Sequence, residues 1–229
     1  MKKKELEAYA ALVLIRTAQI CEPFSVDWLK DRPDLQINNF GVEVTRAIAS
    51  KDAEQYQLDS MVLNCETYKN ANEYISNLNR PEEYCSKPKQ LPDSDRFSLM
   101  SGGGYDEKKH LNLIIKAIVD KSRKFHKYPD HKIFSRRGLY IFDNELHPCM
   151  QLNVESIVKA TNDSIFDVVF IHQLQKLIVV EKDCMPIQEY PIDKVNIYYD
   201  KCEAMRVCGS PDYEIYCERA KVYMESIGY

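Results

Sequence analysis

The amino-acid sequence predicts an α/β protein in which a central mixed sheet is flanked by helices. Helical and strand patterns follow one another in the order helix, hairpin, helices, strand, helix, strand, strand, helix. Such interleaving is typical of helices packed on the faces of a sheet. Segment 166–171 is also nearly all apolar, as expected for a central strand that is covered on both faces.

The other elements are predicted from the spacing of apolar residues. Helical periodicity is present over residues 3 to about 20, 107 to about 128 and 153 to about 162, and in a last helix that follows Pro211. Strand patterns cover residues 139–142, 176–181 and, as an edge strand, 192–199.

Segment 32–45 predicts a tight hairpin whose turn is Asn38-Asn39. Asparagine tolerates the positive φ that a two-residue turn requires. Because the strands pair outward from this turn, Asp34 is expected opposite Glu43. The apolar face of the hairpin carries Leu35, Ile37, Phe40, Val42 and Val44. The polar face carries Arg32, Asp34, Gln36, Glu43 and Thr45.

The polar face sets two carboxylates opposite each other, with their Cβ atoms roughly 5 Å apart. Like charges in this arrangement repel, unless water or a bound cation compensates them. Mg²⁺ binds oxygen ligands and often takes one or two carboxylates together with water and phosphate. The pair Asp34 and Glu43 therefore indicates a metal site. The alternative is a solvated sheet face on which Arg32 neutralises Asp34.

Pro33-Asp34 followed by Glu43-Val44-Thr45 resembles the core motif of the PD-(D/E)XK phosphodiesterase superfamily, which has the restriction-endonuclease-like fold. In that superfamily the Asp and the Glu lie on adjacent strands and hold the metal, Mg²⁺ or Mn²⁺. A Lys two residues after the Glu positions or polarises the attacking water. The resemblance covers about the first fifty residues and, beyond them, the order of elements. Thr45 stands where the superfamily usually has this Lys.

The resemblance also implies a third metal ligand. In the superfamily, a Glu from the first helix often joins the metal site. Glu7 is in phase with Ala10, Ala11 and Leu14 on the packed side of that helix, so we expect Glu7 to take this role ahead of Glu5. An exposed helix acid is the alternative for both residues.

A cation must replace the missing motif Lys if the chain is an enzyme. Some relatives in the superfamily supply it from a nearby helix. Lys121 follows the apolar Ile118 by three residues and is expected near the buried edge of its helix, with Lys124 as the alternative. Either lysine could instead belong to a solvated charged face.

The stretch from residue 121 to 137 is basic and could contact a phosphate backbone. Its candidate contacts are Lys127, Arg136 and Arg137, joined by Arg32 and Gln36 from the polar face of the hairpin. A solvated surface is again the alternative. The formal net charge of −4 provides no global basic field, which counts mildly against a nuclease.

The length of 229 residues is that of one domain, 1–229, with a helical and loop insertion at about 50–106. Within this insertion, residues 80–106 contain three prolines and the run Gly102-Gly103-Gly104, so we expect an irregular loop that could cover the site. The eight cysteines form no CxxC pair and are expected to be free thiols. The sequence shows no transmembrane run and no signal peptide, which predicts a cytoplasmic protein.

Three functional hypotheses follow. The first is a metal-dependent nuclease acting most readily on DNA, in which Asp34 and Glu43 hold Mg²⁺ or Mn²⁺. The second is a catalytically silent protein of the same fold that binds nucleic acid or a protein partner. The third is an interaction domain whose acidic hairpin face is only solvated. No membrane partner is expected, and the sequence is compatible with either a monomer or a homo-oligomer.

Overall fold

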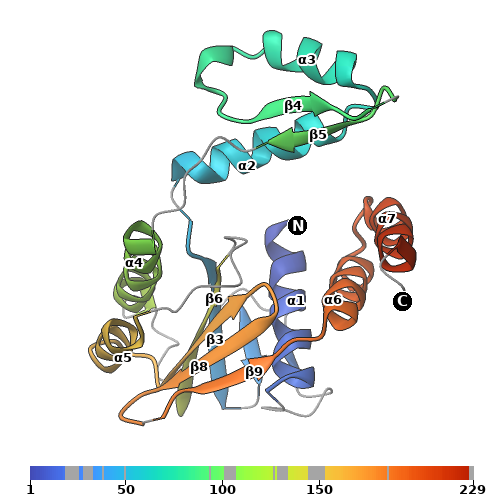
Figure 1. The fold of residues 1–229 in the computed structure, drawn as a ribbon. Helices are drawn as coiled ribbons and strands as arrows, with labels where there is room; N and C mark the ends of the chain where they lie inside the picture. Colours follow the sequence, from blue (N-terminus) through green and yellow to red (C-terminus); the bar gives the residue numbers. More distant parts are fainter. Residues whose placement is uncertain are drawn as a thin grey trace. The chain divides into compact units, whose positions relative to one another are not determined.

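The computed structural model describes two compact units, the first formed by Met1–Ala47 with His110–Tyr229 and the second by Ile48–Lys109 (Figure 1). The described residues are 1–18, 26–27, 33–37, 39–48, 50–92, 94–100, 107–125, 127, 134–143, 153–184 and 186–226. Among them, no helix is both long and apolar enough to cross a membrane.

The first unit is built on a seven-stranded sheet in the order β1-β2-β3-β6-β7-β8-β9. The strands are β1 (Val26–Asp27), β2 (Leu35–Ile37), β3 (Phe40–Arg46), β6 (Arg136–Phe142), β7 (Val168–Gln173), β8 (Lys176–Glu181) and β9 (Gln188–Pro191). Strands β3, β6 and β7 run parallel, and the other neighbours are antiparallel. The predicted class, an α/β protein with a central mixed sheet flanked by helices, is confirmed.

Helices cover both faces of this sheet (Figure 1). Helices α1 (Lys3–Arg16) and α6 (Lys194–Val207) pack on one face, and α4 (Glu107–Phe125) and α5 (Val154–Asn162) pack on the other. Helix α7 (Tyr213–Ser226) packs against α6. The parallel connections from β3 to β6 and from β6 to β7 therefore pass through helices on the same face, which places α4 next to β3.

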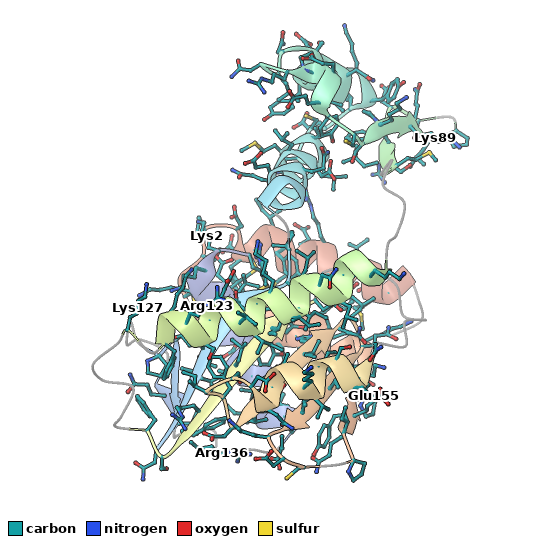
Figure 2. All side chains as sticks on the ribbon, turned by 90° about the vertical axis from the view of Figure 1, so that its left-hand side faces the viewer. Lys2, Lys89, Arg123, Lys127, Arg136 and Glu155 are labelled. Carbon is teal, nitrogen blue, oxygen red and sulfur yellow. The ribbon has the colours of Figure 1, made fainter. Side chains whose placement is uncertain are left out.

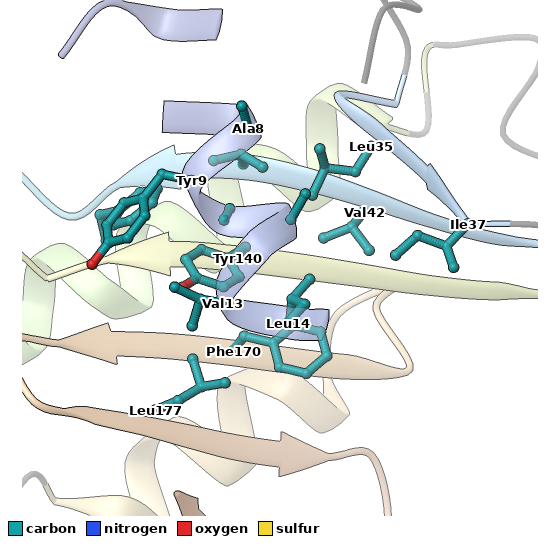
Figure 3. Packing of buried hydrophobic residues seen from close by; sticks show 14 of the residues in the cluster. Ala8, Tyr9, Val13, Leu14, Leu35, Ile37, Val42, Tyr140, Phe170 and Leu177 are labelled. Carbon is teal, nitrogen blue, oxygen red and sulfur yellow. The ribbon is translucent and has the colours of Figure 1, made fainter. Parts of the chain in front are cut away.

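Helix α1 packs closely on the sheet because it presents small and branched apolar side chains. Ala10, Ala11, Val13 and Leu14 are fully buried against the sheet and α6. Figure 3 shows Leu14 between the apolar side chains of neighbouring strands. Burying a Leu or Val side chain of this kind stabilises the fold by roughly 1.5–3 kcal/mol. This packing determines where the first turn of α1, with its charged residues, meets the edge of the sheet.

The hairpin of β2 and β3 has the predicted register, in which Leu35 pairs with Val42 and Ile37 with Phe40. The predicted apolar face is buried in the core beneath α1 (Figure 3). Asn38 of the predicted turn lies outside the described residues.

The prediction of an edge strand over 192–199 is wrong. The edge strand β9 ends at Pro191, and residues 194 onward form α6. Asp193 caps this helix, because its side chain accepts a hydrogen bond of 2.7 Å from the Val195 N–H. The aromatic and β-branched residues of this segment favour a strand locally, but the cap and the burial of one side against α1 favour a helix.

The second unit consists of α2 (Ser50–Leu63), α3 (Tyr68–Ser76), the 3-10 helix η2 (Pro81–Glu83) and a hairpin of β4 (Lys87–Gln90) and β5 (Phe97–Met100). The expectation of a loop without regular structure over 80–106 is therefore wrong for 81–83, 87–90 and 97–100, whereas 101–106 lie outside the described residues. Asp59 of α2 holds the unit together by accepting hydrogen bonds from Tyr84 Oη at 2.7 Å and Ser86 Oγ at 3.1 Å.

Candidate functional site

Asp34 lies directly before β2 and Glu43 lies within the neighbouring strand β3, and both carboxylates are within 3.9 Å of the same Lys121 ammonium group. The Val44 N–H donates a 2.8 Å hydrogen bond to Asp34 Oδ2, which fixes this carboxylate against β3. Gly41 of β3 allows Pro33, the residue before Asp34, to pack closely against this strand, since a Cβ at position 41 would lie only 2.7 Å from Pro33 Cγ. Both acids are buried, with exposed fractions of 4% and 5%.

Lys121 of α4 reaches these carboxylates from a distant part of the chain. Its Nζ lies 2.8 Å from Glu43 Oε2 and 3.9 Å from Asp34 Oδ2. The side chain is mostly buried, because Ile118, one turn earlier, packs in the core between α4 and the sheet. Lys124, the alternative candidate, is exposed on the outer side of α4. Of the two lysines, the structure brings only Lys121 to the acidic pair.

Glu7 joins the cluster from the first turns of α1, where it is buried to an exposed fraction of 5%. Burial and the nearby charge of Asp34 raise the pKa of Glu7, and Lys3 opposes this shift. Glu5 has a different role: its Oε2 accepts a 2.7 Å hydrogen bond from the Lys2 N–H and so caps α1. Of the two helix acids, Glu7 is the one that lies at the site.

Lys3 is a member of the cluster that the sequence analysis missed. Its Nζ lies 3.2 Å from Glu7 Oε1 and 3.0 Å from Asp34 Oδ1. Burial lowers the pKa of Lys3, but the contacts with the two acids outweigh this effect and raise it. The side chain is nevertheless 74% exposed, so it can leave the cluster at little cost in packing. The signal in the sequence is the spacing of four between Lys3 and Glu7.

Three carboxylates and two ammonium groups thus share one site, with a formal charge of −1. Among the described residues, no group of three His, Cys, Asp or Glu side chains is arranged to hold a metal ion. In the carboxylate cluster, Lys3 and Lys121 form ion pairs with the acids. The donor set fits a hard cation, because it offers only carboxylate oxygens. Glu7 Oε1 is buried and, despite its ion pair, accepts no hydrogen bond within the described part of the chain.

Thr45 follows Glu43 by two residues in β3, Gln36 follows Asp34 by two residues in β2, and Arg32 lies outside the described residues. Thr45 is half-buried and lines a cavity of about 370 Å³ that also borders Lys3 and Glu7. Gln36 is half-buried in β2 opposite Gly41. Of the predicted polar face of the hairpin, Thr45 therefore lines the cavity, while Asp34 and Glu43 belong to the carboxylate cluster.

The basic stretch divides into two parts with different partners. Arg136 Nη2 lies 2.7 Å from Glu181 Oε1, and Arg137 Nε lies 3.4 Å from Asp167 Oδ2, so both arginines are already paired with acids. The outward side of α4 and its C-terminal end instead carry exposed cations that form no ion pair within the described part of the chain: Lys116, Arg123, Lys124 and Lys127. Figure 2 views α4 from this side.

A second buried polar cluster lies at the carboxyl ends of β6 and β7. His110 Nε2 pairs with Asp143 Oδ1, and Gln173 Nε2 donates a 3.1 Å hydrogen bond to Asp143 Oδ2. His110 is 1% exposed, so this cluster links α4 to the sheet. We interpret it as structural support for the helix that carries Lys121.

The fold and the site together define an α/β protein with a cluster of carboxylates and lysines at one edge of its parallel strands. Comparisons of this chain with known protein families, with curated proteins and with solved structures found no match.

Proposed function

We propose that the chain is a metal-dependent nuclease that hydrolyses phosphodiester bonds, with DNA as the favoured substrate. One observation carries this proposal. The Lys121 ammonium group lies beside Glu43 and Asp34, and Thr45 stands where the resembled PD-(D/E)XK motif has its lysine. The chain thus has two strand-borne acids and a cation of the kind that the motif requires.

The residues of the cluster have distinct roles in this proposal. Asp34 and Glu43 would hold Mg²⁺ or Mn²⁺, and Glu7 would contribute the oxygen that lacks a hydrogen bond. When bound, such an ion lowers the pKa of a coordinated water and offsets charge on the phosphate. Lys121 is fixed by its ion pair with Glu43 and would orient the attacking water or a phosphate oxygen.

The nucleic-acid backbone would bind along α4. Arg123, Lys124 and Lys127 extend from Lys121 toward the end of this helix and are free of acidic partners in the described part of the chain. Arg136 and Arg137 would have to leave Glu181 and Asp167 first, and breaking such pairs offsets part of the gain from a phosphate contact. The nucleic-acid backbone is therefore expected to contact α4 rather than the two arginines of β6.

A catalytically silent binding protein is the second candidate. It is favoured by the uncharged Thr45 and by the way Lys3 and Lys121 already compensate the three acids. In that case the same α4 surface would bind nucleic acid without cleaving it.

The experiment is a cleavage assay on linear DNA, circular DNA and RNA in Mg²⁺ or Mn²⁺. The wild type is compared with Asp34→Asn and Glu43→Gln, and folding of each variant is checked by thermal unfolding. Cleavage by the wild type that both variants lose supports the proposal. Metal binding without cleavage favours the silent protein. If the chain neither cleaves nor binds metal, the metal-dependent nuclease is excluded, and the silent protein is then supported only if the chain binds nucleic acid.

A further inference from the structure

Arg46 is a half-buried cation that forms no ion pair with an acid of the described part of the chain. It ends β3, one residue after Thr45, and its Nη2 donates a 3.0 Å hydrogen bond to the Met1 carbonyl oxygen. Its Nε is buried and has no hydrogen-bond partner among the described residues. Burial lowers the pKa of the guanidinium, and no carboxylate among residues 1–18, 33–37 or the other described ranges opposes this shift. A guanidinium in this state favours a bound anion.

The space beside Arg46 is large enough for such an anion. Arg46 lines the cavity of about 370 Å³ together with Lys3, Glu7 and Thr45. Its other walls include Leu6, Val44 and Phe142, which are apolar. Sites for small molecules typically have volumes of roughly 300–1,000 Å³ and combine apolar walls with a few polar groups. The cavity therefore suits a phosphate group with an attached sugar.

We infer that this cavity is a phosphate subsite in which Arg46 binds a phosphate group of the substrate strand, beside the carboxylate cluster. Arg46 supplies a planar set of N–H donors that matches phosphate oxygens, and Lys3 and Thr45 add further donors at the rim. Because Glu7 and Lys3 belong both to the cavity and to the cluster, a phosphate held here lies next to the bond that would be cleaved. Only the assignment to a nucleic-acid strand rests on the proposed function; phosphate binding does not.

The test follows the Nε–Hε resonance of Arg46 by ¹H–¹⁵N NMR at low salt in EDTA. The probes are inorganic phosphate, a deoxynucleoside 5′-monophosphate, the same deoxynucleoside without phosphate, and a short single-stranded oligonucleotide. We expect the resonance to shift with the three phosphate-bearing probes and to stay in place with the deoxynucleoside.

Variants test the role of the guanidinium. Arg46→Gln should weaken binding of the monophosphate about tenfold or more, which is the factor expected for losing a charge-assisted hydrogen bond. Arg46→Lys keeps the charge but loses the planar donors. Its affinity for the monophosphate should therefore lie between those of Arg46→Gln and the wild type. Arg80→Gln, which removes an exposed arginine that pairs with Glu83, is the matched control and should bind as the wild type does.

Several results would overturn the inference. Equal affinity in wild type and a folded Arg46→Gln, or a shift caused by the deoxynucleoside alone, excludes a phosphate subsite at Arg46. A response to inorganic phosphate but not to the oligonucleotide assigns the cavity to free phosphate and excludes the substrate strand. Since every arm is metal-free, these results are independent of whether Asp34 and Glu43 bind metal, which calorimetry with Mn²⁺ decides separately.

Discussion

The Nζ of Lys121 lies 2.8 Å from Glu43 Oε2, although 78 residues separate the two in the chain. The contact depends on the packing of α4 against the face of the sheet on which Glu43 stands, with Ile114 and Ile118 fully buried beneath the helix. In the proposed nuclease, this helix lysine would take the place of the lysine that the strand motif lacks. This relationship makes Lys121 the first residue to test.

Lys121→Met should reduce cleavage about a hundredfold, by analogy with the loss of one fixed donor to a developing charge. Lys124→Met, three residues further along the same helix but exposed, is the matched control and should leave the rate nearly unchanged. Introducing Thr45→Lys into Lys121→Met should restore part of the activity, because it returns a cation to the neighbouring strand position. Rates under single-turnover conditions measure all three effects. Equal losses in both lysine variants would contradict the role of Lys121.

Lys3→Met should bind Mn²⁺ more tightly than the wild type does. Lys3 compensates Glu7 and Asp34 and has to move before an ion can use their oxygens. Its removal changes the formal charge of the cluster from −1 to −2, and we expect a gain in affinity of about tenfold, equivalent to roughly one pKa unit of interaction. Calorimetric titration measures this gain, with Lys4→Met as the control. Unchanged or weaker binding in Lys3→Met would show that Lys3 and the metal do not compete.

The exposed cations of α4 should determine the salt dependence of DNA binding. The double variant Arg123→Gln with Lys127→Gln should lower the slope of log K against log salt by about 1.8, since each phosphate contact contributes about 0.9. Arg136→Gln should change the slope less, because that side chain is paired with Glu181. Fluorescence anisotropy at several salt concentrations, in Ca²⁺ or EDTA, gives the slopes. A larger effect of Arg136→Gln would assign the backbone contact to β6 instead.

His172 should make the protein less stable in acid. Burial lowers the pKa of His172 to about 3, and the nearby charge of Lys201 adds to this effect. Its Nδ1 accepts a 2.6 Å hydrogen bond from Tyr140 Oη, as the neutral ring can. Below its unfolded pKa of about 6.5 the unfolded chain takes up a proton and the native ring does not, so the free energy of unfolding falls as the pH drops toward 3.

The size of this effect follows from linkage. The His172 contribution to the slope is at most about 1.4 kcal/mol per pH unit between pH 3 and 6.5. His172→Gln should be less stable at pH 7 because it disturbs the core, yet it should lose less stability between pH 7 and pH 5 than the wild type does. Urea unfolding at both pH values measures this difference. Equal losses would mean that His172 takes up its proton over the same pH range in the native and unfolded states, which contradicts a lowered native pKa.

The sequence was sufficient to predict the hairpin because two independent signals agree there. The alternation of Leu35, Ile37, Phe40 and Val42 indicates which side is buried, and the asparagines indicate where the chain turns. Segment 192–199 lacked such agreement, because its residue types favour a strand while Asp193 and the packing of Ile197 favour a helix. Tertiary packing decides such segments, and it cannot be read from local propensity.

In the site too, some residues can be predicted from local sequence patterns and others depend on tertiary packing. Asp34 and Glu43 follow from the register of one hairpin, so short-range patterns place them together. Lys121 was named only as one of two candidates, because its orientation depends on how α4 packs. For Lys3 the sequence offers only the spacing of four to Glu7, which is common on helices, and for Arg46 at the end of a strand it offers no pattern. Their roles emerge from distances and burial, which exist only in the folded chain.

The location of a bound divalent ion tests the central claim most directly. Crystals grown or soaked with Mn²⁺ would be measured for anomalous scattering, for the wild type and for Glu43→Gln. We expect a wild-type peak at about 2.0–2.2 Å from oxygens of Asp34 and Glu43, with Lys3 displaced, and a lost or much weaker peak in the variant. A wild-type structure at saturating Mn²⁺ in which both carboxylates keep their lysine partners and bind no ion would contradict this expectation.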